Sequence, residues 1–503
     1  MKLFKKTITL AELGKHHISH SAYFTDAEYL HVAHDLQKII KKLNFMKMFG
    51  KGFDEDLAIN LTLHLEDTVA NAGLWRTFCM EHHKLYGKWL PFGWGDDEMP
   101  LDEVTLDSCK FIVWMTISNT HEWHHINPIM PHINDIAEAV FVYLIDVFYD
   151  IAINTEMLDQ LYGDDDDFYK VRNVLEWIAN DSYLSDWDVT RDVLETHVKT
   201  LKQMFKNTFG EPWIYGARAM SAFGSGVGPL ALFPQEWYAA MLQTYEEKDC
   251  SWKASLVSEM KFARFDKYFI DSSSEKIINV KDLDGNHYAI DRESLGAITG
   301  GKEIPSNYNL YVGMLVLYKG LWQINGISMI TSTLKDYDEE KKKNLEYKDK
   351  HELAAKYFER FVQNHKNRRL YYFEDISAME KWLRDEIKFK NASGFVKTLP
   401  NYMKKDERII VFIPSDGDPE ITVHDIESIK DPNNPYYNEQ VSREVGFELI
   451  NAIYSIRKEC FHYLLDHGML TDLSYRDYDP ERGHKLFQEN IDFIARFTRR
   501  AGY

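Results

Sequence analysis

The period of the hydrophobic pattern changes near Lys261, and this change limits the possible fold more than any other feature of the chain. Upstream, residues 26–205 repeat apolar positions at helical spacing, as at positions 57, 61, 65 and 69 of a segment that ends at Gly73. Downstream, short strand-like runs follow one another, and Asp284-Gly285 marks a tight turn between two of them. The sequence therefore predicts an α+β protein, mostly α, with a small β-barrel or curled sheet in its middle.

These patterns divide the 503 residues into five parts. Glycine and proline interrupt the helical pattern over residues 209–234, and a helix restarts at Pro234. Residues 311–330 predict two strands around Lys319-Gly320. The predicted parts are an N-terminal arm (1–25), an acidic helical front domain (26–208), a connector with one helix (209–260), a barrel-like domain (261–334) and a mixed α/β, largely helical C-terminal region (335–503) with a basic helical stretch and two terminal helices.

Finer predictions are possible inside the front domain and the C-terminal region. Ala139–Ile153 has large apolar residues on most sides, which predicts the buried central helix of the front domain, with Asp146 and Asp150 on one face. The remaining predicted elements are a strand pair (408–414 and 420–423) and the two terminal helices (440–467 and 483–499).

The formal net charge of −20 is confined to one block of the sequence. Residues 51–190 hold 27 Asp and Glu against 7 Lys and Arg, whereas the rest of the chain carries 52 of each sign. Such a block disfavours nucleic acid as a partner, because affinity for phosphates comes mostly from cations. It favours a basic protein surface instead, with an association that charge accelerates and salt weakens.

The cysteines and the apolar segments indicate a soluble, cytoplasmic protein. Four cysteines lie far apart without a CxxC spacing, so we expect neither a disulfide framework nor a thiolate zinc site. The first 17 residues lack the apolar core of a signal peptide. The most apolar run, Ala139–Ile153, is too short to span a bilayer, and we therefore expect no membrane partner.

The sharpest candidate for chemistry is the string HEWHH at residues 121–125. Read as H-E-x-x-H, it would place His121 and His125 one helical turn apart as zinc ligands, with Glu122 activating the metal-bound water. Pro128 follows closely and no residue at the expected spacing supplies a third ligand, so a polar helix end is the competing interpretation. Glu122 and His125 also form an E-x-x-H pair of the di-iron type. Zinc is thus an alternative cofactor, and the other motifs predict none.

One basic and aromatic stretch, residues 365–373, lies in the neutral part of the chain. Lys366, Arg368 and Arg369 can contact phosphates and Tyr371 can stack on a base, which makes RNA binding an alternative function. The competing interpretation is a helix end with solvated cations, followed by buried aromatic residues. The acidic tract Asp164–Asp167 lacks the alternating ligands and the glycine of a calcium loop, and it predicts a solvated turn between helices.

Six short segments, in the same order along most of the chain, carry a resemblance to a known family. They are YGKWLPF (86–92), DEVTLDSCKFIVW (102–114), INP (126–128), FYKVRNVLEW (168–177), NNPYY (433–437) and DFIARFTRRAGY (492–503). Together they resemble an uncharacterised bacterial family that is catalogued as a domain of unknown function. The resemblance implies a bacterial, non-secreted protein with a helical front and a partly β back, and it supplies no activity and no site residue.

These observations favour a cytoplasmic binding or adaptor protein that docks a basic partner through an anionic helical surface and has no catalytic centre. The first alternative is a metal-dependent hydrolase that uses zinc at His121 and His125 with Glu122 as the catalytic base. The second alternative is an RNA-binding protein that uses the barrel and residues 365–373. Sequence alone leaves the identity of the partner and the oligomeric state open.

Overall fold

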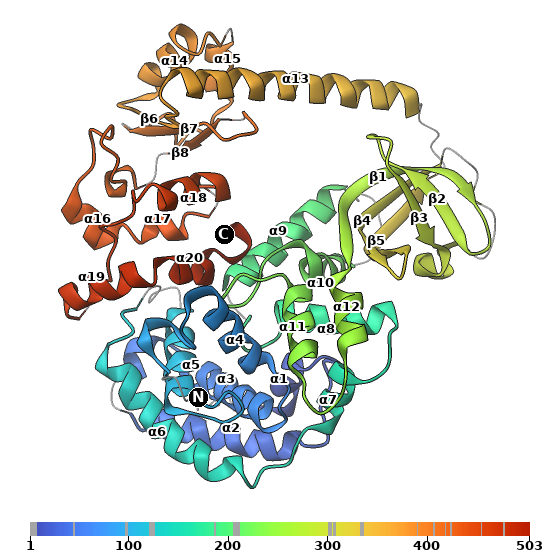
Figure 1. The fold of residues 1–503 in the computed structure, drawn as a ribbon, viewed down its shortest axis with the longest axis vertical. Helices are drawn as coiled ribbons and strands as arrows, with labels where there is room; N and C mark the ends of the chain where they lie inside the picture. Colours follow the sequence, from blue (N-terminus) through green and yellow to red (C-terminus); the bar gives the residue numbers. More distant parts are fainter. Residues whose placement is uncertain are drawn as a thin grey trace, which may run out of the picture. The chain divides into compact units, whose positions relative to one another are not determined.

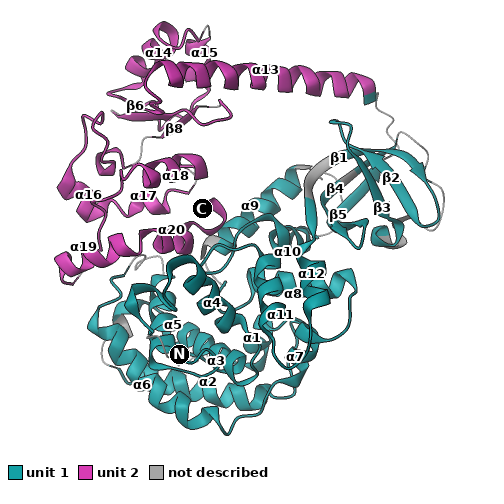
Figure 2. Ribbon diagram, in the orientation of Figure 1, with its two compact units in different colours: residues 1–337 teal, residues 338–503 magenta. Residues whose placement is uncertain are grey.

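The computed structural model divides the chain into two compact units, residues 1–337 and 338–503 (Figure 2). Unit 1 joins the predicted front domain, connector and barrel, and its end falls three residues after the predicted end of the barrel. The structure confirms a mostly helical chain with a small five-stranded mixed barrel and a helical C-terminal part. It describes residues 8–43, 46–95, 99–119, 126–185, 188–204, 212–299, 304, 308–331, 337–389, 391–405, 408–417, 419–422, 425–453, 455–475 and 478–503.

The first part of unit 1 consists of helices, as the helical period predicts. Several of them begin at side chains that accept hydrogen bonds from the free N–H groups of the first turn, such as Thr105 and Asp167. In chain order these helices are α1 (Leu10–Leu13), η1 (Gly14–His16), α2 (Asp26–Lys41), η2 (Met46–Phe49), α3 (Phe53–Val69), α4 (Leu74–Tyr86), η3 (Pro91–Gly93), α5 (Leu106–Ser118), α6 (Pro131–Phe148), α7 (Thr155–Tyr162), α8 (Phe168–Asn180), α9 (Asp188–Met204), α10 (Trp213–Gly224), α11 (Pro234–Thr244) and α12 (Ser251–Ser258).

Helices α3 and α5 form the interior of this helical part. Both bury side chains on all sides, including the predicted apolar positions Leu57, Leu61 and Leu65 of α3. Helix α2 packs on α3, α3 on α5, α5 on α6, and α6 returns to α2 (Figure 1). This arrangement buries two apolar helices by surrounding them with amphipathic ones, which leave their polar faces in solvent.

The prediction that Ala139–Ile153 is the buried central helix is wrong. Residues 139–148 form the second half of α6, whose inner side packs against α5, α2 and α3 while its outer side is exposed, and residues 149–153 follow the end of the helix. Asp146 and Asp150 do lie on one face, and that face is the exposed one. Apolar content alone misleads here, because exposed surfaces of proteins also carry large apolar side chains, and Val142 is one of them.

The second part of unit 1 is the predicted barrel. Its strands pair in the closed order β1-β2-β3-β5-β4, with β3 parallel to β5 and all other neighbours antiparallel. This strand order with one parallel pair is that of the OB-fold barrel. The predicted turns are confirmed, since Gly285 and Gly320 adopt positive φ between paired strands. The elements are β1 (Lys261–Ser273), β2 (Ile277–Lys281), β3 (His287–Asp291), η4 (Arg292–Thr299), β4 (Asn309–Tyr318) and β5 (Leu321–Thr331).

Two glycines allow the barrel to pack closely on α10. Gly326 of β5 has φ +86°, and a Cβ atom there would lie 3.3 Å from the Cα atom of Gly216 and from the Cβ atom of Ala219. The acidic tract also contributes to this junction, because the Asp166 carbonyl accepts a hydrogen bond of 2.8 Å from the Tyr318 hydroxyl. The barrel is therefore part of unit 1 through direct backbone approach.

Unit 2 combines a three-stranded antiparallel sheet, β6-β7-β8, with helices. The predicted strand pair is confirmed as β7 and β8, whereas β6 was missed because it lies in the basic and aromatic stretch. The predicted helix 440–467 is broken into three, and the predicted helix 483–499 is broken at Asn490. The elements are α13 (Tyr337–Asn364), β6 (Leu370–Phe373), α14 (Ile376–Asp385), α15 (Ala392–Thr398), β7 (Ile409–Phe412), β8 (Glu420–Thr422), η5 (Ile426–Ser428), α16 (Glu439–Val445), α17 (Glu448–Asn451), α18 (Lys458–Asp466), α19 (Pro480–Glu489), α20 (Ile491–Arg499) and η6 (Arg500–Gly502).

Two expectations about cysteines and membranes can be compared with this fold. All four cysteines are buried and none forms a disulfide, as their spacing predicts. Across the described ranges, no helix combines the length and the apolar character needed to cross a membrane.

Candidate functional site

The predicted zinc motif falls outside the described residues. His121, Glu122 and His125 belong to residues 120–125, between α5 and α6 in the sequence. Zinc-dependent hydrolysis at these residues stays a prediction.

The predicted RNA-binding residues lie at the edge of the sheet in unit 2. Arg369 forms an ion pair of 2.7 Å with Glu359 and donates a hydrogen bond to the Ile413 carbonyl. The Arg368 guanidinium lies 4.7 Å from the centroid of the Tyr371 ring, which is itself 7 % exposed. Lys366 is exposed in a turn and has φ +59°. Because both arginines and the tyrosine already serve the fold, RNA binding here stays a prediction that would require these contacts to rearrange.

The acidic tract is partly neutralised within unit 1. Asp164 forms an ion pair of 2.6 Å with Lys248, Asp165 pairs with Lys170, and Asp166 pairs with Lys319. Asp167 accepts hydrogen bonds from the first turn of α8. The tract is thus an inter-helix segment, as predicted, and its charge is not available to a partner in full.

The outer face of α6 carries a group of exposed negative charges. Asp135, Glu138, Asp146 and Asp150 are all exposed, and none of them forms an ion pair with another described residue. Their spacing of three, four or eight positions places them on one side of the helix and of the turn that follows it. Three exposed apolar side chains alternate with them along this side: Val142 (63 % exposed), Tyr149 (71 %) and Ile153 (54 %).

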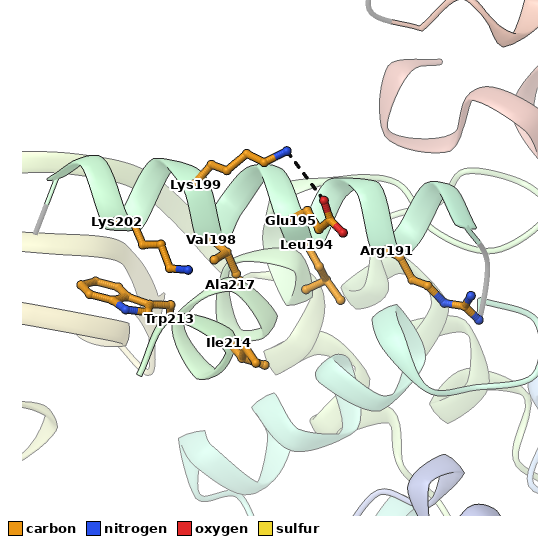
Figure 3. A pocket seen from close by; sticks show the side chains of 9 residues that line it. All are labelled: Arg191, Leu194, Glu195, Val198, Lys199, Lys202, Trp213, Ile214 and Ala217. Carbon is orange, nitrogen blue, oxygen red and sulfur yellow. Dashed lines mark ion pairs between the residues drawn. The ribbon is translucent and has the colours of Figure 1, made fainter. Parts of the chain in front are cut away.

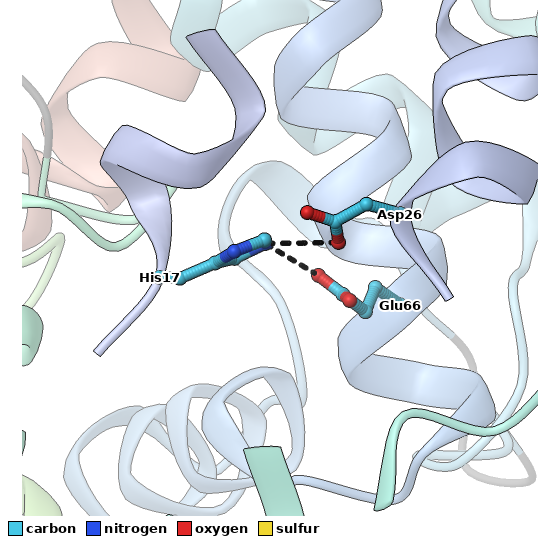
Figure 4. Close-up of side chains that lie close together, drawn as sticks. All are labelled: His17, Asp26 and Glu66. Atoms are coloured by element: carbon cyan, nitrogen blue, oxygen red, sulfur yellow. Dashed lines mark ion pairs between the residues drawn. The ribbon is translucent and has the colours of Figure 1, made fainter. Parts of the chain in front are cut away.

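A second candidate site is buried inside the helical part, where the ring of His17 points toward two carboxylates (Figure 4). His17 follows η1, Asp26 is the first residue of α2, and Glu66 is near the end of α3. The Nε2 atom of His17 is 3.6 Å from Oδ1 of Asp26 and 3.9 Å from Oε2 of Glu66. All three side chains are at most 5 % exposed. We call these three residues the His17 cluster.

Burial controls the electrostatics of the His17 cluster. It raises the pKa of Glu66 to about 8 and that of Asp26 to about 6, because a carboxylate loses its hydration inside the protein. It lowers the pKa of His17 to about 4 for the same reason. Next to this cluster, Asp67 accepts hydrogen bonds from the Tyr183 hydroxyl and from the first N–H groups of α4.

A surface hollow of about 590 Å³ lies between α9 and α10 (Figure 3). Its lining includes the apolar side chains of Trp213 and Ile214 and three cations, Arg191, Lys199 and Lys202. Lys199 lies 3.7 Å from Glu195 of the same helix. The hollow therefore has the opposite charge character to the outer face of α6.

The sequence shows only a faint sign of the His17 cluster. Its members are 9 and 40 positions apart and form no motif. The available signal is in α3, where His64, Glu66 and Asp67 interrupt the apolar side of a helix that must be buried. Buried ionisable residues are uncommon unless they are paired or bind an ion, so this interruption could have marked the site.

The fold places the chain among mostly helical proteins that carry a small mixed β-barrel. More specifically, the chain belongs to the family described as "Protein of unknown function (DUF3843)", whose model matches residues 13–274 and 325–500. This match confirms the resemblance that the six segments indicate. A comparison with curated proteins finds no match, and a comparison with solved structures finds none either.

Proposed function

We propose that the chain is a binding or adaptor protein that docks a basic, amphipathic protein surface onto the outer face of α6. The single observation that carries this proposal is the exposed stripe from Asp135 to Ile153, in which unpaired carboxylates alternate with large apolar residues. A partner of complementary chemistry would present lysines or arginines beside apolar side chains.

The exposed stripe raises the free energy of the isolated protein, which supports a role in binding. Like charges three or four positions apart on a helix repel one another by a few tenths of a kcal/mol each. Val142, Tyr149 and Ile153 also leave apolar surface in water, where each Å² that a partner covers contributes about 25 cal/mol. A cationic amphipathic partner removes both penalties at once.

The charge makes a distinct kinetic prediction. Carboxylates gathered on one face accelerate association with a basic partner at low salt. At physiological ionic strength the field of exposed charges decays over about 8 Å, so the effect depends on salt concentration. Binding through this face must therefore weaken as salt rises, mainly through a slower association rate.

The experiment compares capture of partners from a cell lysate by the full chain and by two variants with the same change in net charge. Asp135→Lys with Asp146→Lys reverses charge within the stripe. Glu259→Lys with Glu275→Lys changes two exposed carboxylates of unit 1 that lie elsewhere. Proteins that are captured at low salt and lost at high salt should disappear with the stripe variant and remain with the control.

Two outcomes would contradict the proposal. If both variants lose the same proteins, net charge rather than the stripe is responsible. If neither variant loses any salt-sensitive protein, the outer face of α6 does not dock a basic partner. Circular dichroism of both variants checks that the helical content is unchanged.

A further inference from the structure

We propose that His17, Asp26 and Glu66 bind one divalent transition-metal ion, for which Zn²⁺ is the probe. The three donor atoms lie within 4.8 Å of one another and come from the segment after η1, from α2 and from α3 (Figure 4). Donors about 2.0–2.2 Å from zinc, at angles between tetrahedral and trigonal, lie roughly 3.3–3.8 Å apart. The observed spacings of 3.6 and 3.9 Å approach that range.

The orientation of the imidazole supports a metal rather than a hydrogen-bonded network. The Nδ1 atom of His17 lies 2.8 Å from the Ser21 carbonyl oxygen, which can only accept, so Nδ1 carries the proton. The lone pair of Nε2 then points toward the two carboxylates. The gaps of 3.6 and 3.9 Å are too long for hydrogen bonds, so no proton bridges them.

In each carboxylate, one oxygen accepts a hydrogen bond and the other oxygen faces His17. Oδ2 of Asp26 accepts a hydrogen bond of 3.0 Å from the Tyr23 N–H, and Oε1 of Glu66 accepts one of 2.7 Å from the Asn154 amide. Oδ1 of Asp26 is buried and has no hydrogen-bond partner. Metal sites show the same arrangement, because hydrogen bonds to the oxygens that do not face the metal orient the ligands.

The charge of the two carboxylates in the His17 cluster also suits a divalent cation. Among the described residues, the ion-pair contacts of Asp26 and Glu66 are with His17 alone, and no lysine or arginine pairs with either carboxylate. Two buried carboxylates are costly to ionise without a cation, and burial therefore raises the pKa of both. A divalent ion neutralises both.

The donor set selects the class of metal. One imidazole nitrogen and two carboxylate oxygens suit zinc, manganese or iron, whereas calcium prefers six to eight oxygens and magnesium keeps most of its water. A cavity of about 20 Å³ adjoins His17, Tyr23 and Glu66 and has room for one water molecule as a further ligand. The ion would connect the segment around His17 to α2 and α3, and it does not depend on the docking face of α6.

The experiment measures Zn²⁺ binding to the full chain after treatment with a chelator, by calorimetry and by the visible spectrum of the Co²⁺ form. Glu66→Gln keeps the shape of the side chain and the acceptor for Asn154 but removes one anionic ligand. We expect about one Zn²⁺ per chain in the unaltered protein and at least ~100-fold weaker binding in the variant. Mg²⁺ should not compete.

Two controls distinguish this site from other histidines. His16→Gln alters the neighbouring imidazole, which contacts the Asp181 carbonyl instead of the cluster. His121→Ala with His125→Ala removes the predicted zinc motif. Both controls should retain the Zn²⁺ and the Co²⁺ spectrum that Glu66→Gln loses.

A second measurement tests the site without relying on the binding affinity. Zn²⁺ should slow amide hydrogen exchange in peptides that cover residues 13–25, because the ion links this segment to two helices. The proposal is overturned if the chelator-treated protein binds no Zn²⁺. It is also overturned if a folded Glu66→Gln variant, with unchanged circular dichroism, still binds one Zn²⁺ per chain with unchanged affinity.

Discussion

Replacing Arg499 by methionine should destabilise unit 2 locally and strongly. Arg499 is fully buried, and its guanidinium donates hydrogen bonds to the carbonyls of Ile450 and Ile456. These two carbonyls lie where the chain leaves α17 and enters α18, so helical hydrogen bonds do not satisfy them. The guanidinium also lies 4.2 Å from the centroid of the Phe461 ring. Methionine keeps the apolar stem of arginine and removes all donors.

The magnitude follows from opposing contributions. Leaving two buried carbonyls unsatisfied costs about 1–3 kcal/mol each, and losing the contact with the Phe461 ring costs up to about 2 kcal/mol. Burial, however, lowers the pKa of Arg499 to about 10, which means that the charged guanidinium is itself penalised. Replacing the charged group by methionine removes that penalty and adds back about 3 kcal/mol to the free energy of unfolding, since one pKa unit equals about 1.4 kcal/mol. The net expected loss is about 3 kcal/mol.

The assay is amide hydrogen exchange followed by mass spectrometry on the full chain. A loss of about 3 kcal/mol corresponds to roughly 100-fold faster exchange in the protected peptides of α17, α18 and α20, with no change in unit 1. Arg499→Lys keeps a charge and fewer donors, so it should show an intermediate effect. Acceleration below about fivefold in Arg499→Met would refute the reasoning, because it would show that the carbonyls need no partner.

Two further predictions concern pH and backbone approach in unit 1. Burial lowers the pKa of His82 to about 4, and its ring donates to the Lys88 carbonyl, so the unfolded chain binds the proton first. The free energy of unfolding should therefore fall as pH drops from about 6.5 to 4. In urea titrations, the fall should be about 2–3 kcal/mol smaller in His82→Gln than in the unaltered protein. Equal pH profiles of the two proteins would contradict this prediction. Gly326→Ala should lower the melting temperature more than Gly320→Ala does. Both positions have positive φ, but only at position 326 would the added Cβ atom meet Ala219. Equal losses would show that the contact with α10 is unimportant.

Local patterns in the sequence predicted most elements of the fold. The turn at Lys319-Gly320 could be predicted because tight turns need positive φ, a conformation that glycine accepts without strain. In the structure both residues adopt positive φ. The same residues join β4 to β5 in the structure. Strand β6 was missed because Arg368 and Arg369 precede it and suggested a solvated helix end, although both arginines bond to neighbouring backbone carbonyls.

The candidate sites depended on packing over long distances in the sequence. The block of acidic residues was evident, but the sequence could not show that Asp164 and Asp165 pair with lysines while Asp146 and Asp150 form no ion pair with a described residue. The formal charge therefore overstates what a partner can meet. Only the structure shows that one group of exposed carboxylates without ion pairs lies on the outer face of α6.

By itself, the sequence determined the type and order of most elements, since helix and strand periods reflect contacts between residues two to four positions apart. Tertiary structure decided which helices are central, because burial depends on how α2, α3, α5 and α6 surround one another. It also decided the chemistry of His17, Asp26 and Glu66. Each is an ordinary polar residue along the chain, and only packing brings their donor atoms within 4.8 Å of one another away from water, which is the geometry behind the proposed metal site.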